Sequence, residues 1–557
     1  MKKYENEFLY IYDKNHTNIL KFKNFKRFYK IFENKNNIFF SSIKHSKNII
    51  TFGLYHKNLD GTFVRIEFDK RSIKFLTDSI SAIPVYYKVT KNNIIVSSSI
   101  GLMIDICKSL NISVRMNEDA INEILLSSYI FTRSLTPLDK VFKITPNSIL
   151  KVCLKKGKHQ IKYNKIDFNY SSTERSFNDC VLDLRTNILK GLLRHKGKKV
   201  GVLLSGGADS RLIAACAVEA GLKPEFITFG QSTVNSSDFS IANYVAYKLG
   251  AKTECYFASS DNFKSNWKET NEKLNWSGDQ VWYFGKLPKS FFKKISTYDV
   301  ILRGDGDGVY GWGDNVGNIY DVFHKLEICH IESFKKYATY FKNEKKLFYK
   351  INQRIELLMN NYKIEKNINN LKNKLYVQLR EEGCIAPSLG YLSSFVKVDS
   401  PLMWSSSIKI ASYLPKNKRS NKEIIFSVLK TFKTIRDIDF SQGSSWNNNL
   451  EFYFSNIWEY LIEYSLIWSP WKLDQKGIKQ FFNKPPSPPK NQTILQILKG
   501  KIKYHLQKNI TLRNFVFKKY PQLFESTFKD RGLIRVAVVS NLNERINSSR
   551  GFFCDKS

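Results

Sequence analysis

Hydrophobic runs and helical patterns alternate through the middle of the chain. The run 200–204 is continuously apolar (Val-Gly-Val-Leu-Leu), which is typical of a buried strand. A helical pattern follows over 212–220, and a β-rich run covers 225–230 after the Gly-Leu-Lys-Pro turn. Because the order is strand, helix, strand, we expect a parallel pair of strands with a right-handed crossover.

The same alternation continues toward the centre of the sequence. Apolar positions over 236–250 predict a helix that ends at Gly250, followed by a strand over 253–257. The run 298–302 is a further buried-strand candidate. We therefore predict an α/β domain built on a parallel sheet, with ligands bound at the carboxyl ends of its strands.

In the first part of the chain the β-rich runs are short and follow one another closely. Several short β-rich runs are joined by turns that contain Asn or Asp, and these runs span 63–68, 73–76, 85–89 and 94–98. Short strands at close spacing predict an antiparallel sheet, so we expect a separate N-terminal β-rich domain.

Length and composition fit two or three domains. The chain has 557 residues, of which 42% are hydrophobic. No run of eighteen apolar residues occurs, and the first residues lack the apolar centre of a signal peptide, so we expect a cytoplasmic protein without membrane insertion. The eight cysteines have no Cys-x-x-Cys spacing and indicate neither a zinc site nor a disulfide framework.

The formal net charge of +38 comes from lysines that are spread along the whole chain. This distribution indicates a compositional bias and disfavours nucleic-acid binding. The Pro-rich run 485–489 reads as a stiff linker, and we expect 485–557 to form a basic C-terminal extension. Such an extension could also dock an acidic protein or peptide.

Polar residues with chemistry follow the 200–204 run. The sequence Ser-Gly-Gly-Ala-Asp-Ser spans Ser205 to Ser210. We expect the glycines to let the backbone adopt positive φ and approach an anion closely, and the first N–H groups of the following helix to form a phosphate seat. Asp209 beside a phosphate requires a divalent cation. The alternative is a simple strand-to-helix turn with Ser205 as the helix cap.

A second loop follows the 298–302 run. It spans Arg303 to Gly313 and places Asp305 and Asp307 at alternate positions between glycines, which suits a Mg²⁺ site. A calcium loop is excluded, because the twelfth position counted from Asp305 is Val316 rather than a glutamate. An ordinary Asp-Gly turn is the alternative.

These motifs resemble the PP-loop of the ATP pyrophosphatases and, over residues 50–430, the asparagine synthetase family. The family's Ser-Gly-Gly-x-Asp-Ser is matched at 205–210, and its Gly-Glu-Gly-x-Asp-Glu loop is echoed at 303–313. The resemblance implies ATP and Mg²⁺ as cofactors, with Asp209 and Asp307 as metal ligands. It also implies nucleotide-binding residues, namely Leu203, Ser205, Gly206, Gly207, Asp209, Ser210, Phe229 and Gly230.

Further motifs of the family are altered. In the segment 395–403, Pro401 matches the family's Glu-x-Arg-x-Pro, but Lys397 and Asp399 fall near its Glu and Arg, so the usual aspartate pocket is in doubt. In the family a cation stabilises the negative charge that develops when the amine attacks the activated carboxylate, and we expect this cation just downstream. We predict Lys422 and Asp307 as catalytic residues, with Lys430, Lys433 and Arg436 as alternatives to Lys422.

The amino-terminal domain of the family is matched as well. Its motifs are similar to Asp60–Phe63, Thr77-Asp78, Pro84–Tyr87, Ser97–Ser99 and Ile144–Pro146. This implies an Ntn-hydrolase-like α+β domain. Glutamine-hydrolysing members carry an N-terminal cysteine after Met removal, whereas the first cysteine here is Cys107 and no Asn-Gly-Glu segment occurs. We therefore expect no glutaminase activity, as in β-lactam synthetases and lasso-peptide cyclases.

The expected organisation is a glutaminase-inactive amidotransferase-like domain over 1–165, a PP-loop synthetase domain with a helical C-terminal part over 175–470, and the extension. The expected function is an ATP-dependent, AMP-forming amide ligase that adenylates a small-molecule or peptide carboxylate and transfers it to an amine. One alternative is a family member that has become a non-catalytic ATP-binding scaffold. The other is a PP-loop enzyme that acts on nucleic acid, and the positive net charge is its only support.

Overall fold

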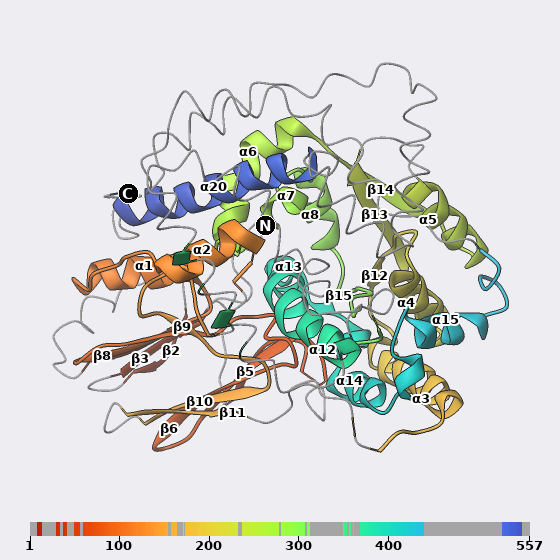
Figure 1. Ribbon diagram of the computed structural model, residues 1–557, viewed down its shortest axis with the longest axis horizontal. Helices are drawn as coiled ribbons and strands as arrows, with labels where there is room; N and C mark the ends of the chain where they lie inside the picture. The colour runs from red at the N-terminus through yellow and green to blue at the C-terminus, as the bar shows by residue number, and fades with distance from the viewer. Residues whose placement is uncertain are drawn as a thin grey trace.

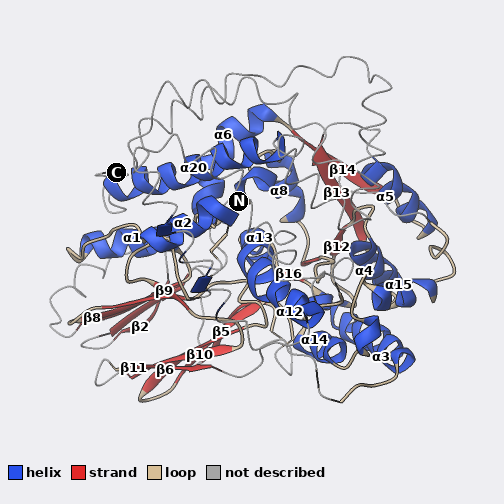
Figure 2. Cartoon of the chain, in the orientation of Figure 1, coloured by secondary structure: helices blue, strands red, loops and turns tan. Residues whose placement is uncertain are grey.

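A computed structural model provides the fold (Figures 1 and 2). It describes residues 8–13, 29–33, 37–41, 49–55, 60–127, 129–130, 132, 134–153, 158–163, 171, 173–231, 237–277, 280–306, 309–311, 349–350, 353, 356–357, 360, 368–438 and 526–548.

Two antiparallel sheets form the N-terminal domain, as expected from the short β-rich runs. The first sheet has the order β2 (Tyr29–Glu33), β3 (Asn37–Ser41), β1 (Phe8–Asp13), β8 (Asn93–Ser97), β7 (Tyr86–Val89), β9 (Phe142–Lys143). The second has the order β11 (His159–Tyr163), β10 (Ser148–Cys153), β6 (Ser72–Thr77), β5 (Phe63–Phe68), β4 (Ile49–Gly53).

Side-chain alternation along β1 shows why this strand is buried on both faces. Phe8 and Tyr10 pack into the core between the two sheets, whereas Leu9 and Ile11 face the opposite way into the larger core. Successive strand residues point to opposite faces, so every described residue from Phe8 to Ile11 is fully buried. Helices α1 (Ile100–Ser109) and α2 (Glu118–Ser127) contribute to the same larger core as Leu9.

The second domain is built on a parallel sheet, which confirms the α/β expectation. Its strand order is β14 (Thr253–Ala258), β13 (Glu225–Gln231), β12 (Val200–Leu203), β15 (Val300–Leu302), β16 (Val398–Asp399). All four pairings are parallel. Strand order reverses at β12, because β13 follows it on one side and β15 lies on the other. In sheets of this kind ligands bind at the carboxyl ends of the strands where the order reverses, which here are the ends of β12 and β15.

Helices cover this sheet and bring the later part of the chain to the crevice. Helix α4 (Ala208–Glu219) contacts β12, α3 (Phe177–Leu192) and α15 (Glu423–Lys430). The remaining helices of the domain are α5 (Ser237–Lys248), α6 (Ser260–Lys273), α7 (Val281–Phe284), α8 (Lys289–Ile295), α12 (Ile368–Leu375), α13 (Ala386–Ser393) and α14 (Ser405–Ser412), with short 3₁₀ turns at η3 (Leu193–His195), η5 (Pro401–Met403) and η6 (Lys416–Lys418). A π-helix, η4 (Tyr376–Ile385), links α12 to α13.

The segment expected as a basic extension contains a packed helix. Helix α20 (Ser526–Asn547) runs beside α6 and contacts α2 (Figure 1). Its Val536 to Val539 and Leu542 are buried in the larger core, so this part of the extension joins the two domains. The proposed linker at 485–489 lies outside the described residues.

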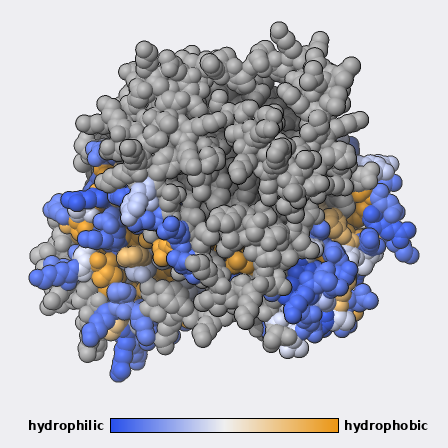
Figure 3. All heavy atoms as spheres, in the orientation of Figure 1, coloured by the Kyte–Doolittle hydropathy of each residue, from blue (hydrophilic) through white to orange (hydrophobic). Residues whose placement is uncertain are grey.

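Hydrophilic and hydrophobic residues are interspersed on the described part of the face in Figure 3. Among the described helices, none has the length and apolar character needed to cross a membrane.

Candidate functional site

The turn after β12 is closed by its own hydroxyl groups. The Ser205 N–H donates to Ser210 Oγ at 3.1 Å, and the two serine hydroxyls lie 2.9 Å apart. The Gly207 N–H donates to Ser205 Oγ at 3.3 Å. Both hydroxyls expected to contact a phosphate therefore first hold the turn in shape.

Helix α4 begins directly after this turn without a side-chain cap. Its N-cap is Gly207, which has no side chain to cap the first turn, and Ser205 Oγ accepts only from the N–H of Gly207 itself. The structure thus differs from the simple-turn alternative, in which Ser205 caps the helix. The first N–H groups of a helix lack intrahelical partners and carry the positive end of its dipole, so this end of α4 suits an anion.

The two glycines of the turn do not adopt the left-handed angles expected of them. Gly207 has extended angles (φ −80°, ψ 165°), and Gly206 is not among the left-handed glycines of the described chain. The expectation of positive φ is therefore wrong. A Cβ atom on Gly207 would meet only Ser205 Oγ, at 3.4 Å. Among the described residues, a methyl group at this position would therefore find room.

One amide of the turn is already engaged. The Gly206 N–H donates to Asp238 Oδ1 at 2.7 Å, from the first turn of α5. We expected the amides of this turn to be available to phosphate, and the structure removes this donor from the set. The contact also ties the turn to α5, which lies beside β13.

The loop after β15 packs directly against the start of α4. A Cβ atom on Gly304 would lie 2.3 Å from the Ser210 nitrogen and 2.4 Å from the Asp209 carbonyl carbon. Only glycine allows the two main chains to approach so closely. Asp305 is buried, 2.8 Å from Arg303 Nη2. Asp307, the expected second metal ligand and catalytic residue, lies outside the described residues.

Lys422 reaches the same place from a third segment. Its Nζ lies 2.6 Å from Asp209 Oδ2, and its N–H donates to the Gly311 carbonyl at 2.8 Å. Lys422 immediately precedes α15 and has left-handed angles (φ 54°, ψ 33°). Left-handed backbone is unfavourable for a lysine, and such outliers cluster at functional sites. The structure therefore brings together two residues that the sequence analysis singled out independently.

Arg419 holds the segment that carries Lys422. Its Nε donates to the Leu414 carbonyl at 2.8 Å, and its own carbonyl accepts from Asn373 Nδ2 at 2.9 Å. Its backbone lies against Gly311, where a Cβ atom would come within 2.6 Å of it. The side chain is 3% exposed. The sequence analysis missed this residue.

Arg211 is a second buried cation that the sequence analysis missed. It is 1% exposed, and it donates to the Gly206 carbonyl at 3.3 Å and to the Ile438 carbonyl at 2.6 Å. The sequence did contain a signal for this residue. Arg211 directly follows the motif and precedes an apolar stretch of α4, where a charged side chain needs a polar partner. Arg211 secures the turn to the segment beyond α15.

The other residues expected to bind the nucleotide, Leu203, Phe229 and Gly230, lie on β12 and β13. Leu203 is buried and pairs with Ile227 across the two strands. Phe229 is half-buried, with its ring 5.2 Å from that of Phe291, and Gly230 pairs with Phe257. These positions are at the carboxyl end of the sheet, on the same side as the turn.

Asp399 has a structural environment. It is fully buried, with Oδ2 2.8 Å from His195 Nε2, and Oδ1 accepts from Trp404 Nε1 at 2.6 Å. In the sequence Asp399 falls near the family's arginine, which put the usual aspartate pocket in doubt. Here the residue instead connects β16, η3 and the start of α14.

Of the two carboxylates expected to bind Mg²⁺, Asp209 is the one that lies among the described residues. Asp209 can offer an oxygen to Mg²⁺ at the start of α4, because hard cations prefer carboxylate ligands. No cluster of three or more His, Cys, Asp or Glu side chains suited to a metal occurs within the described ranges. Asp209 at an uncapped helix start fits a cation that is shared with phosphate oxygens rather than a closed protein cage.

Comparison with known proteins agrees with the site. The family described as Asparagine synthase matches residues 192–421, which include the turn, the Gly304 loop and the segment before Lys422. A Methanocaldococcus jannaschii protein named "Putative asparagine synthetase (glutamine-hydrolyzing) 1" is 33% identical over 132 residues. That match spans 22% of this chain and 23% of the relative. Residues 192–421, which hold the turn, the loop and most of the parallel sheet, are therefore similar to the Asparagine synthase family.

Proposed function

We propose that the protein is an ATP-dependent amide-bond ligase that forms AMP and pyrophosphate. The match of residues 192–421 to the Asparagine synthase family supports an ATP-dependent ligase. The single observation that carries the proposal is the ion pair between Lys422 and Asp209 at the uncapped start of α4. It sets a cation and a carboxylate beside the first N–H groups of α4, where a triphosphate would be bound.

In this proposal the turn 205–210 holds the phosphates mainly through its main chain. The first turn of α4 supplies N–H groups, and Ser205 and Ser210 keep the turn rigid through their mutual hydrogen bond. Leu203, Phe229 and Gly230 would line the adenine end. Asp209 and Asp307 would hold Mg²⁺, which when bound neutralises charge on the leaving pyrophosphate.

Two half-reactions follow from this arrangement. An oxygen of the substrate carboxylate attacks the α-phosphorus, the bond to the β-phosphate oxygen breaks, and pyrophosphate leaves. The nitrogen of an amine then attacks the activated acyl carbon, the bond to the AMP oxygen breaks, and the amine loses a proton. Lys422 would stabilise the negative charge that develops in both steps, because its ammonium group is fixed beside the phosphate seat.

The proposal includes no glutamine hydrolysis. Cys107, the first cysteine of the sequence, lies inside α1 and is 1% exposed. Burial raises the pKa of its thiol to about 12, so it is not a nucleophile. The motif residue Asp60, matched to the family's N-terminal domain, accepts from the Ser406 N–H at 3.0 Å and thereby contacts the synthetase domain instead. The N-terminal domain would therefore act as a scaffold, and the amine would come from a substrate.

A non-catalytic ATP-binding scaffold is the second candidate. The observation in its favour is the hydrogen bond from the Gly206 N–H to Asp238, which removes a phosphate donor and adds a carboxylate near the seat. Such a scaffold would bind ATP without exchanging pyrophosphate.

The deciding experiment is ATP–pyrophosphate exchange with Mg²⁺ and a panel of carboxylates. The ligase predicts exchange that depends on one class of carboxylate and is lost in Asp209→Ala, with AMP formed once an amine is added. ATP binding with no exchange above the Asp209→Ala background for any carboxylate would instead favour the scaffold. Released glutamate from glutamine should stay at background throughout.

A further inference from the structure

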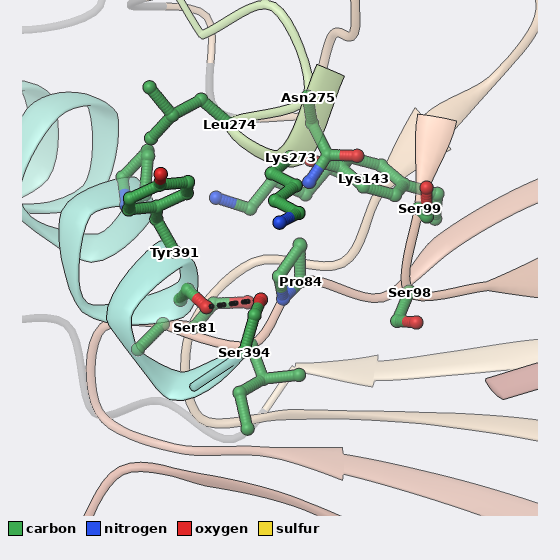
Figure 4. A pocket seen from close by; sticks show the side chains of 15 residues that line it. Ser81, Pro84, Ser98, Ser99, Lys143, Lys273, Leu274, Asn275, Tyr391 and Ser394 are labelled. Atoms are coloured by element: carbon green, nitrogen blue, oxygen red, sulfur yellow. Dashed lines mark hydrogen bonds between the residues drawn. The ribbon is translucent and has the colours of Figure 1, made fainter. Parts of the chain in front are cut away.

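A cavity of about 60 Å³ lies at the junction of the two domains, between the N-terminal strands, the end of α6 and α13 (Figure 4). An adjoining cavity of about 50 Å³ is lined by Lys143 and by the buried carboxylate of Glu382. Because side chains of both charges line this space, it indicates no ligand of one charge. A stripe of apolar side chains on α3 also lies outside the candidate site, and this stripe faces solvent.

Helix α3 lies at the edge of the molecule in Figure 1, where α4, α14 and α15 contact it. One of its faces is buried in the core, through Cys180, Leu184, Ile188 and Leu192. The opposite face carries Leu182, Thr186 and Leu189, and Leu193 extends it into η3. Leu182 is 61% exposed and Leu193 is 51% exposed. Single leucines on a surface are ordinary, whereas a row of them along one helix indicates a contact surface.

The spacing of this stripe reads the same in both chain directions. Its four positions, 182, 186, 189 and 193, are separated by four, three and four residues. A two-fold axis perpendicular to a helix reverses the order of its residues, so two copies of α3 can pack antiparallel with their stripes in register. Leu182 then meets Leu193 of the second copy, and Thr186 meets Leu189 of the second copy. A second copy of this chain therefore fits the stripe.

Charged residues beside the stripe are complementary under the same reversal. Asp183 and Lys190 are seven residues apart, so they share one flank of α3. Antiparallel packing brings Lys190 opposite Asp183 of the second copy, and it brings Lys196 opposite Asp179 of the second copy. Arg175 Nη1 donates to Asp183 Oδ2 at 2.6 Å and so holds this carboxylate on the flank. Parallel packing would instead place like charges opposite each other.

We propose that the α3 stripe is the interface of a homodimer, in which two copies of α3 pack antiparallel around a two-fold axis. The formal net charge of +38 makes most contacts between two copies repulsive, and the paired charges along α3 offset this repulsion locally. The stripe alone is smaller than the about 800 Å² per partner of a standard interface, so the association should be reversible. The proposal does not depend on the proposed ligase activity.

Analytical ultracentrifugation of the full chain, from low to high micromolar concentration at constant ionic strength, tests the proposal. We expect a monomer–dimer equilibrium. Leu182→Ser and Leu193→Ser should each weaken it at least about tenfold, because each removes a leucine from both halves of the interface. Tyr247→Ser, at a 72% exposed position of α5, is the matched control and should change nothing. A protein that stays monomeric throughout, or leucine variants that dimerise as tightly as the wild type, would overturn the proposal.

Charge reversal tests the antiparallel arrangement separately. Lys190→Glu and Asp183→Lys should each weaken self-association about fivefold, because each sets like charges opposite one another. An equimolar mixture of the two variants should dimerise about as tightly as the wild type, since opposite charges then face each other in both pairs. A mixture that associates no better than the separate variants would show that the two flanks do not meet, and the antiparallel interface would be wrong.

Discussion

Lys422 combines an unfavourable backbone with a precise contact. Its left-handed angles cost about 1 kcal/mol or more for a residue with a Cβ atom. The surrounding structure fixes them through the Gly311 carbonyl and the buried Arg419. The result is an amine 2.6 Å from Asp209. Spacing along the sequence could not distinguish Lys422 from Lys430. Their roles differ because Lys422 precedes α15 at the turn, whereas Lys430 lies at the other end of this helix.

Replacement of Lys422 by methionine should reduce ATP–pyrophosphate exchange about 10²-fold, because a preorganised donor to the developing charge is lost. Lys430→Met is the matched control, since Lys430 is exposed at the other end of α15. Exchange rates at saturating ATP decide the matter. A similar loss in both variants would mean that Lys422 acts only through general charge.

Elements that strong local patterns specify were predictable, and contacts between elements were not. The strand–helix–strand order around β12 follows from apolar runs and Gly or Pro punctuation, and it is confirmed. Positive φ at the turn glycines was wrong because a Gly-Gly pair serves equally for left-handed angles and for close approach. Asp238 was missed as a partner of Gly206 because it comes from α5, 32 residues away.

Helix α14 is capped from the other domain. It has no cap from its own N-cap residue, and Asp60 accepts from both the N–H and the hydroxyl of Ser406, at 3.0 and 2.9 Å. We predict that Asp60→Ala destabilises the protein by about 1–2 kcal/mol, the usual effect of losing an N-cap. Asp60→Asn, which keeps one acceptor, should lose less. Urea unfolding measures both, and equal stability of Asp60→Ala and the wild type would exclude the capping role.

At the scale of the whole molecule, α20 joins the domains. Asn541 accepts from Trp276 Nε1 at 3.0 Å, and Arg545 Nη2 lies 2.6 Å from Asp105 of α1. More than 200 residues separate these partners, so no local pattern could have revealed the contact. The described end of the predicted extension is instead part of the core.

The Asp105 carboxyl makes this junction dependent on pH. Burial raises its pKa from 3.8 to about 6, although Arg545 lowers it. The fold therefore favours the protonated form, and this contribution to stability is lost as pH rises from about 4 to about 6. Over that window the wild type should lose about 2–3 kcal/mol relative to Asp105→Asn. Urea unfolding at pH 4, 5, 6 and 7 checks this. A constant difference between the two proteins would contradict it.

The turn at 205–210 as a phosphate seat is the central claim, and Gly207→Ala tests it most directly. Its backbone angles suit alanine, and the added methyl group would meet only Ser205 Oγ at 3.4 Å, so the folded protein should remain as stable as the wild type. The same methyl group would occupy the space through which a phosphate approaches. Calorimetric titration with Mg²⁺-ATP should therefore show at least about tenfold weaker binding, or about 1.4 kcal/mol. Unchanged ATP affinity in a stably folded Gly207→Ala protein would contradict the account.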